Sequence, residues 1–145
     1  MEHYPKIYLF RRVVQAKLFI DEHFAENLDL DNISDEACFS KFHFIRLFKK
    51  IYGKTPHQYL TVVRMERAKI LLRDDIPVSE VCYAVGFESL SSFSGLFRRL
   101  VGKAPSEYSQ LQREIKIQIV KAPLQFIPGC FAEQNGWTKK AILKN

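Results

Sequence analysis

At 145 residues the chain is long enough for one domain or two small subdomains, and its composition, 47% hydrophobic and 26% charged, is that of a globular protein. The net charge of +6 favours an acidic partner such as nucleic acid or an anionic membrane surface, but no apolar run is long enough to cross a bilayer. The three scattered cysteines (Cys38, Cys82 and Cys130) come with no C-x-x-C motif, no Cys/His cluster and no signal peptide, which excludes a disulfide or metal framework and indicates a reducing cytoplasm.

The first predicted element is a helix over about Ile7 to Phe24. The residues expected together on one side of it are Val14, Leu18 and Phe19. A loop over Glu26 to Asp31 and a short helix near Leu30 to Cys38 follow. The stretch from Asp21 to Glu36 carries seven acids and no Lys or Arg.

A basic amphipathic helix is predicted over Ser40 to Tyr52. Its apolar stripe repeats at helical spacing and comprises Phe44, Leu47, Phe48 and Ile51. Ser40 suits the N-cap, and Gly53 suits the left-handed residue that ends a helix. The stretch from Lys41 to Lys54 contains five basic residues and no acidic residue, and it follows directly after the acidic stretch. This charge pattern indicates a molecule with one basic working face.

The rest of the body also reads as helical. Thr55-Pro56 is a strong helix start, and a long helix is expected over about 55 to 73. Two short helices are expected near Val78 to Val85 and Ser89 to Val101, and a last one from Pro105 to about Arg113. Because no convincing pair of strands occurs before residue 114, the sequence predicts an all-α body of about seven helices.

Residues 114–145 form a tail of uncertain structure. The run from Glu114 to Ile119 alternates like a half-buried strand, but it could also extend the last helix, pack along the body or pair with another chain. The apolar patch from Phe126 to Phe131 could cover exposed core or form a protein contact.

An internal repeat is the most informative pattern in the chain. A shift of 49 residues places the stretch from Ser40 to Tyr59 on the stretch from Ser89 to Tyr108, and it superposes GKTPHQY on GKAPSEY. Upstream the shift becomes 48, so one extra residue, Glu88, lies in the second turn. Each unit has a short helix, a turn and a second helix with a basic end, which is the pattern of a helix-turn-helix.

The region from about Leu30 to Tyr108 resembles the DNA-binding domain of AraC/XylS-type transcriptional regulators. The motifs that carry this resemblance are F-K-K-x-x-G-x₅-Y ending at Tyr59, R-x-E-x-A-x-x-L-L beginning at Arg64, Val85-Gly86-Phe87 and Gly102-x-x-Pro105-x-x-Tyr108. The resemblance implies two homeodomain-like helix-turn-helix subdomains joined by a long linker helix. The expected division is residues 1–113 for the DNA-binding domain, with helix-turn-helix units at about 30–52 and 78–101, and 114–145 for the tail.

The resemblance also assigns roles to side chains. In the family, bases are generally read from the positions of Phe42, Ile45 and Arg46. A guanidinium such as that of Arg46 can donate two hydrogen bonds to guanine, and apolar side chains suit thymine methyl groups. Phe42 and Ile45 could instead complete a wide core face. The basic side chains expected to contact DNA phosphates are Lys41, Lys49, Lys50, Lys54, Arg98 and Arg99, although any one of the lysines could be merely solvated.

The second unit departs from the family pattern. Ser91 and Ser94 occupy the base-reading positions, and Gly95 stands where the family commonly carries arginine. Serine hydroxyls discriminate little between bases, so we expect the first unit to carry most of the base specificity and the second to grip the backbone.

Several other residues have a structural interpretation. Cys82 is expected to fill the core, His43 to lie on the helix surface, and Arg64 and Glu66 to bridge the two lobes. Gly86 and Phe87 are read as the turn glycine and a core anchor.

The sequence therefore predicts a bacterial, cytoplasmic, sequence-specific DNA-binding regulator without cofactor or enzymatic activity, binding double-stranded DNA as a monomer. About 30 residues precede Leu30, so the chain resembles single-domain members of the family. Such regulators usually activate by contacting RNA polymerase, although no polymerase-contact surface is visible in the sequence. The alternative is an interaction module that keeps the fold and modulates other regulators without reading DNA.

Overall fold

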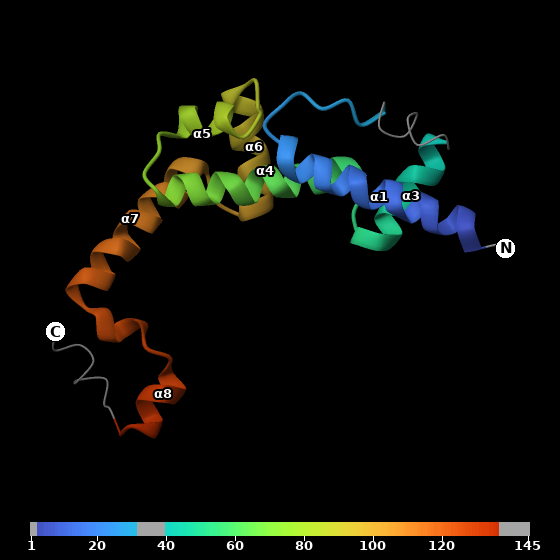
Figure 1. Cartoon of the computed structure of the whole chain (residues 1–145). Helices are drawn as coiled ribbons and strands as arrows, with labels where there is room; N and C mark the ends of the chain where they lie inside the picture. The colour runs from blue at the N-terminus through green and yellow to red at the C-terminus, as the bar shows by residue number, and fades with distance from the viewer. Residues whose placement is uncertain (1–2, 32–39, 137–145) are drawn as a thin grey trace.

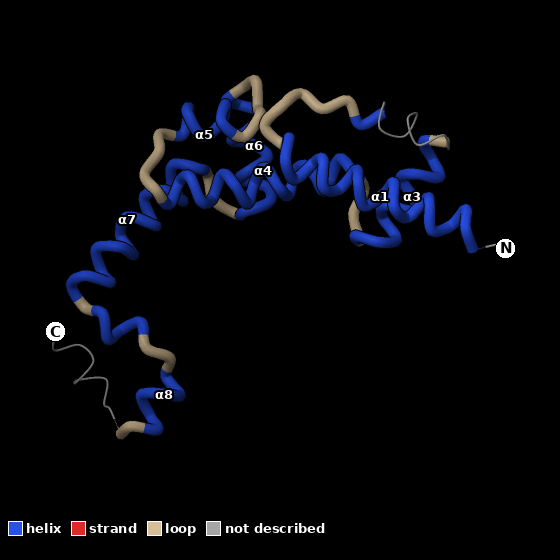
Figure 2. The backbone as a smooth tube through the Cα atoms, viewed as in Figure 1, coloured by secondary structure: helices blue, strands red, loops and turns tan. Residues whose placement is uncertain are grey.

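The computed structural model describes residues 3–31 and 40–136, and these ranges are helical and contain no strand (Figure 2). The helices are α1 (His3–His23), α3 (Lys41–Tyr52), α4 (Pro56–Arg73), α5 (Val78–Ala84), α6 (Leu90–Val101), α7 (Pro105–Lys121), a short 3₁₀ helix η1 (Pro123–Phe126) and α8 (Gly129–Gln134). The short helix expected near Leu30 to Cys38 lies mostly outside the described residues. None of the described helices combines the length and the hydropathy that crossing a bilayer requires.

The long linker helix α4 organises the body into two lobes (Figure 1). Its N-terminal part packs with α1 and α3 in the first lobe, and its C-terminal part packs with α5 and α7 in the second. At about 1.5 Å per residue, the 18 residues of α4 span about 27 Å. The predicted all-α body with two units on one linker helix is therefore confirmed.

Both units are capped in the same way, as the repeat predicts. Ser40 Oγ accepts a hydrogen bond from the His43 amide at 3.2 Å, and Ser89 Oγ accepts one from the Ser92 amide at 3.1 Å. Gly53 and Gly102 end the two helices with φ of 75° and 88°, a left-handed conformation that glycine adopts without a Cβ penalty.

The repeat also returns as two equivalent aromatic stacks. In the first lobe, Phe48 lies 5.8 Å from Tyr59, ring centre to ring centre, in an edge-on contact. In the second lobe, Phe97 lies 5.6 Å from Tyr108 in the same arrangement. Both phenylalanines are completely buried. Each stack joins a helix with a basic end to the helix that follows it.

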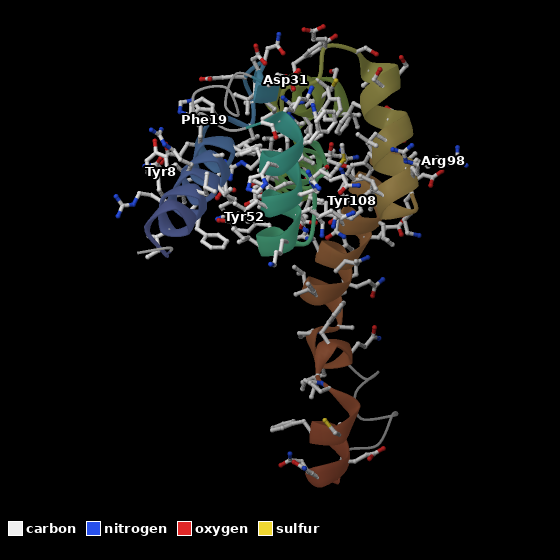
Figure 3. All side chains as sticks on the ribbon, turned by 90° about the vertical axis from the view of Figure 1, so that its right-hand side faces the viewer. Tyr8, Phe19, Asp31, Tyr52, Arg98 and Tyr108 are labelled. Atoms are coloured by element: carbon white, nitrogen blue, oxygen red, sulfur yellow. The ribbon has the colours of Figure 1, made fainter. Side chains whose placement is uncertain are left out.

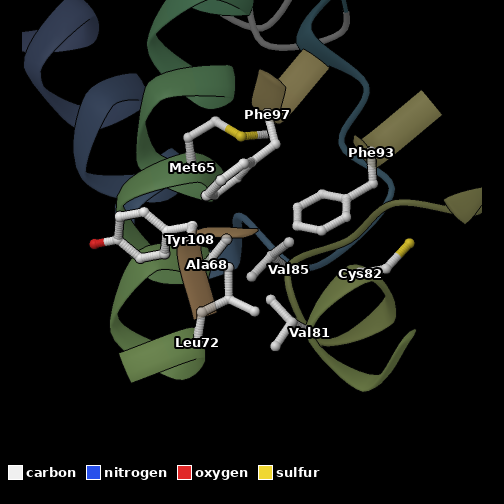
Figure 4. Close-up of a cluster of buried hydrophobic side chains, with 9 residues drawn as sticks. All are labelled: Met65, Ala68, Leu72, Val81, Cys82, Val85, Phe93, Phe97 and Tyr108. Atoms are coloured by element: carbon white, nitrogen blue, oxygen red, sulfur yellow. The ribbon is translucent and has the colours of Figure 1, made fainter. Parts of the chain in front are cut away.

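The second core closes around α4 (Figure 4). Met65, Ala68 and Leu72 of α4 meet side chains from α5, α6 and α7. Cys82 is completely buried there and its Sγ lies 3.9 Å from the Phe87 carbonyl oxygen, so its predicted role as a core residue is confirmed. Burial raises the pKa of this thiol.

The buried side of α1 is not the one expected. Val14, Leu18 and Phe19 are 41%, 50% and 41% exposed. The side that packs into the first core comprises Val13, Ala16 and Ile20. The reason is that α1 is apolar on more than one side, so the helical period alone does not decide which side packs into the core.

The last helix continues past Arg113 to Lys121, so of the readings left open for the start of the tail, helix extension is correct and the strand is wrong. Arg113 Nε donates to Asp75 Oδ1 at 2.6 Å, and the Lys116 ammonium donates to the Arg73 carbonyl oxygen, which docks α7 on the end of α4. Beyond this contact α7, η1 and α8 extend away from the two lobes (Figure 3). The apolar side chains left largely exposed there include Ile117, Ile119, Val120, Phe126 and Phe131.

The contact between Tyr59 and Asp21 gives a first prediction. The Tyr59 hydroxyl donates to Asp21 Oδ1 at 2.5 Å and ties α1 to α4. Tyr59→Phe should lower the free energy of unfolding by about 1 kcal/mol, less than is usual for a charged acceptor because Asp21 is partly exposed. Burial and this hydrogen bond raise the Tyr59 pKa, so the loss should persist below the ordinary tyrosine pKa of 10.0 and fade above it. Urea unfolding measures the effect.

The matched control is Tyr83→Phe, which removes a hydroxyl from a side chain that is 61% exposed. It should leave the free energy of unfolding unchanged within about 0.5 kcal/mol. Equal effects from the two substitutions would contradict the role given to the Tyr59 hydroxyl.

Candidate nucleic-acid interface

The first candidate recognition helix is α3, which presents a basic, acid-free surface outside the first core. Phe44 and Phe48 are buried beneath it and Leu47 is half-buried, while Ile51, the last member of the predicted stripe, is 38% exposed. Lys49 and Lys50 lie exposed in its last turn and Lys54 lies exposed just beyond Gly53. The residue types and their exposure match a helix that faces a polyanion.

The two apolar candidates for base contact differ in position. Phe42 is 73% exposed, an unusual environment for a phenylalanine in a body with two well-filled cores. Ile45 is half-buried and packs against the first core cluster. Ile45 thus has the core contact that its alternative interpretation required, and Phe42 does not.

Arg46 lies on the exposed side of α3, one turn after Phe42. Its Nε donates to the Phe42 carbonyl oxygen at 3.3 Å, which holds the guanidinium along the helix surface. This bond engages Nε, so the two terminal nitrogens keep donors for a planar acceptor pair such as the guanine edge. His43 lies exposed on the same helix, as predicted for a surface residue.

Lys41 has an acidic partner within the described part of the chain. Its Nζ lies 2.8 Å from Asp31 Oδ1. A phosphate at Lys41 would have to compete with this carboxylate. The pairing was missed from the sequence, although the acidic stretch directly upstream was the signal that could have indicated it.

The second candidate recognition helix is α6, which has the same buried stripe and basic end as α3 but different residues on its exposed side. Phe93 and Phe97 are buried, and Arg98 and Arg99 are exposed in the last turn, with Arg98 on the outer side of the helix (Figure 3). At the start of α6 the side chains are hydroxyls, and Ser89 Oγ lies 2.9 Å from Ser91 Oγ and 3.2 Å from Ser92 Oγ. Ser91 is exposed and Ser94 half-buried.

Gly95 leaves an open space on α6. A Cβ built at this position would meet no atom within 4 Å. The missing side chain is therefore not required by packing inside the chain.

Arg64 and Glu66 of the linker helix were both predicted to bridge the lobes, and the prediction is correct for Arg64 and wrong for Glu66. The Arg64 guanidinium donates to the carbonyl oxygens of Phe24 at 2.7 Å and Glu26 at 2.9 Å. Glu66 instead lies exposed and pairs with Lys69 at 2.8 Å on the same helix. Glu66 is one turn from Lys69, and this local pair needs no partner in either lobe.

Two acid-free amphipathic helices on equivalent supports, joined by one long helix, define a domain with two helix-turn-helix units. We call these units the two heads, the first containing α3 and the second containing α6. Residues 33–111 match the family described as a helix-turn-helix domain. The chain is similar to the probable transcriptional regulator LumQ of Photobacterium leiognathi, 38% identical over 91 residues, which are 62% of this chain and 37% of that protein. It is also similar to the transcriptional activator RhaS of Escherichia fergusonii, 36% identical over 93 residues, which are 63% of this chain and 34% of that protein.

Among solved structures, the chain is similar to the DNA-binding domain of AdpA, a global transcriptional factor, in complex with a target DNA. The TM-score is 0.68 at 31% sequence identity, covering 73% of this chain and 96% of that domain. The chain belongs to the AraC/XylS-type family of helix-turn-helix transcriptional regulators. It spans about a third of the length of the two curated relatives described above.

The open space at Gly95 gives a second prediction. Gly95→Ala should raise the free energy of unfolding by about 0.5–1 kcal/mol, because alanine restricts the unfolded chain and its Cβ meets no neighbour. Gly102→Ala is the control: it also has open space, but φ is +88°, so a loss of about 1 kcal/mol is expected. Chemical unfolding of the two variants measures both effects, and a destabilised Gly95→Ala would contradict the description of α6.

Proposed function

We propose that this chain binds double-stranded DNA by placing α3 and α6 in successive major grooves and thereby regulates transcription. The observation that carries the proposal is the duplicated arrangement of a capped helix with no acid and a basic last turn, each fixed by the same aromatic stack. The AdpA domain, of which 96% aligns with this chain, was solved in complex with a target DNA. The two units are joined by one helix of about 27 Å, a length of the same order as the 34–36 Å or so between successive major grooves on one face of a duplex.

We propose a division of labour between the two heads. Arg46 and Phe42 would read base edges in the first half-site, with Ile45 adding a smaller apolar contact beside the core. Ser91 and Ser94 would contribute weak base contacts in the second half-site. Six basic side chains would contact phosphates and so fix the register of both helix-turn-helix units on the DNA. They are Lys41, Lys49, Lys50, Lys54, Arg98 and Arg99.

The division is tested with Arg46→Ala and Ser91→Ala. Selection of sites from random duplex DNA by the wild-type chain defines the preferred sequence. Arg46→Ala should then lose about 1–3 kcal/mol of discrimination at one base pair, because the bidentate donor is gone. Ser91→Ala should change the preferred sequence little. Equal loss of base preference from both variants would refute the proposed division.

The phosphate contacts are tested by salt dependence. Arg99→Ala should weaken binding to all sequences by a similar factor and lower the slope of log affinity against log salt by about 0.9. Arg67→Ala is the matched control, because Arg67 is exposed on α4 outside the predicted interface. If the chain instead bound proteins and not DNA, with an affinity that changes little with salt, this result would favour the interaction module over the DNA-binding regulator.

Gly95 offers a gain-of-function test of the second head. Gly95→Arg would place the family's common side chain on the front of α6, into open space. We expect a new guanine preference of about 1–3 kcal/mol in the second half-site. Gly95→Met, of similar length without donors, should not create it. A binding-site selection that returns the wild-type sequence for Gly95→Arg would show that this position does not face the bases.

We further propose that one copy occupies one asymmetric site in a bacterial cytoplasm and activates transcription by contacting RNA polymerase. Both heads belong to one polypeptide, so binding needs no second copy. The mass of the complex on a selected duplex tests the first point: one chain per site is expected, and two would overturn it.

A further inference from the structure

We propose that Arg64 is the positioning residue that sets the distance and angle between the two DNA-binding heads, and so sets which half-site spacing the chain accepts. This inference rests on the proposed binding of two successive grooves. Arg64 itself lies on α4 and not on α3 or α6, and it belongs to neither set of predicted base or phosphate contacts. Its effect would act through the position of the two lobes.

The first step of the argument is what Arg64 holds. Its Nε donates to the Phe24 carbonyl oxygen at 2.7 Å and its Nη2 donates to the Glu26 carbonyl oxygen at 2.9 Å, both in the turn that follows α1. That turn is closed by the bond from the Glu26 amide to the His23 carbonyl oxygen at 3.0 Å. Arg64 therefore ties a segment of the first lobe to the middle of α4 through backbone acceptors.

The second step is that the second lobe reaches the same point. The guanidinium carbon of Arg64 lies 5.6 Å from the centre of the Phe87 ring, a cation–π contact with the turn of the second helix-turn-helix. At Gly86, with φ of +95°, a Cβ would lie 3.0 Å from the carbonyl oxygens of both Phe24 and Ala25. The turn of the second lobe thus lies directly against the turn that Arg64 holds.

The third step is that the two cores also meet here. Phe24 packs against the core cluster of the first lobe and against that of the second. We call this contact the inter-lobe junction, and it comprises Phe24, Ala25, Glu26, Arg64, Gly86 and Phe87. Arg64 is half-buried, and this burial lowers its pKa.

The consequence is mechanical. A single helix fixes the separation of two attached lobes along its axis, but small shifts in the packing at either end can still turn one lobe relative to the other. The inter-lobe junction lies off this axis and removes the rotation. Because half-sites of DNA lie at fixed separation and helical phase, a relaxed junction should bind several spacings where a fixed junction binds one.

Distance measurements on the free protein provide the first test. Spin labels at Lys50→Cys and Arg99→Cys, which are equivalent positions of α3 and α6, are introduced with Cys38 and Cys130 changed to serine. Pulsed electron spin resonance should give one narrow distance distribution for the unmodified junction. Arg64→Met should broaden it, while Arg67→Met, which removes the same charge from an exposed position on α4, should not. A distribution in Arg64→Met as narrow as in Arg67→Met would overturn the proposal.

Two further variants protect this test against a folding defect, which thermal unfolding would reveal. Arg64→Lys keeps the charge, but one ammonium group cannot replace the two directed donors, so a smaller broadening is expected. Gly86→Ala places a methyl group against the Phe24 and Ala25 carbonyls, so its mean distance should shift; because φ at Gly86 is +95°, this variant is measured at a temperature where thermal unfolding shows it folded. Unchanged distributions in both variants would also overturn the proposal.

The DNA test compares duplexes in which one base pair is added between the two half-sites of the selected sequence. We expect the wild-type chain and Arg67→Met to lose about tenfold or more in affinity, as when one or two base contacts are lost. Arg64→Met should lose much less, and Arg64→Lys an intermediate amount. An equal spacing penalty in Arg64→Met and Arg67→Met would refute the role of Arg64. If the wild-type chain selects no site at all, the proposed function fails, while the distance measurement still tests the junction.

Discussion

The edge-on contact between a phenylalanine of one helix and a tyrosine of the next supports both candidate recognition helices. Phe48 with Tyr59, and Phe97 with Tyr108, join α3 to α4 and α6 to α7. A fully buried aromatic side chain accounts for a large share of the apolar area of so small a core, and its ring geometry restricts how the two helices can cross. The basic side of each helix is consequently presented at a fixed angle, and the front residues can vary without changing the support.

This separation of support from front explains how much the sequence could predict. The repeat, the two caps and the helix-ending glycines recur at constant spacing, and each acts through its immediate neighbours, so the units and the linker helix could be placed from the pattern. Cys82 could be assigned to the core for the same reason. The roles of Arg46 and Ser91 remain predictions, because exposure on a helix surface does not identify the partner.

The features that the sequence did not settle depend on choices between similar patterns. On α1, Val13, Ala16 and Ile20 satisfy the helical period as well as the expected set does, and only the packing against α3 and α4 selects between them. The run Ile115-Lys-Ile-Gln-Ile119 alternates like a strand, yet α7 reaches Lys121, since docking of Arg113 and Lys116 on α4 favours continuing the helix. The acceptors of Arg64 are backbone carbonyls, which every residue carries, so no pattern of side chains could reveal them.

The two heads differ where the differences cost the fold least. Gly95 and the serines of α6 lie outside the second core, and the aromatic stack below them matches that of the first lobe. Under the proposed division between the two units, the second helix makes weak base contacts, so its contribution to affinity depends more on its being positioned correctly in the groove. A chain with one strong head and one weak head therefore needs a stiff connection more than a chain with two strong heads does. The junction around Arg64, which uses two backbone acceptors and a ring instead of a flexible surface ion pair, has the geometry that such a connection requires.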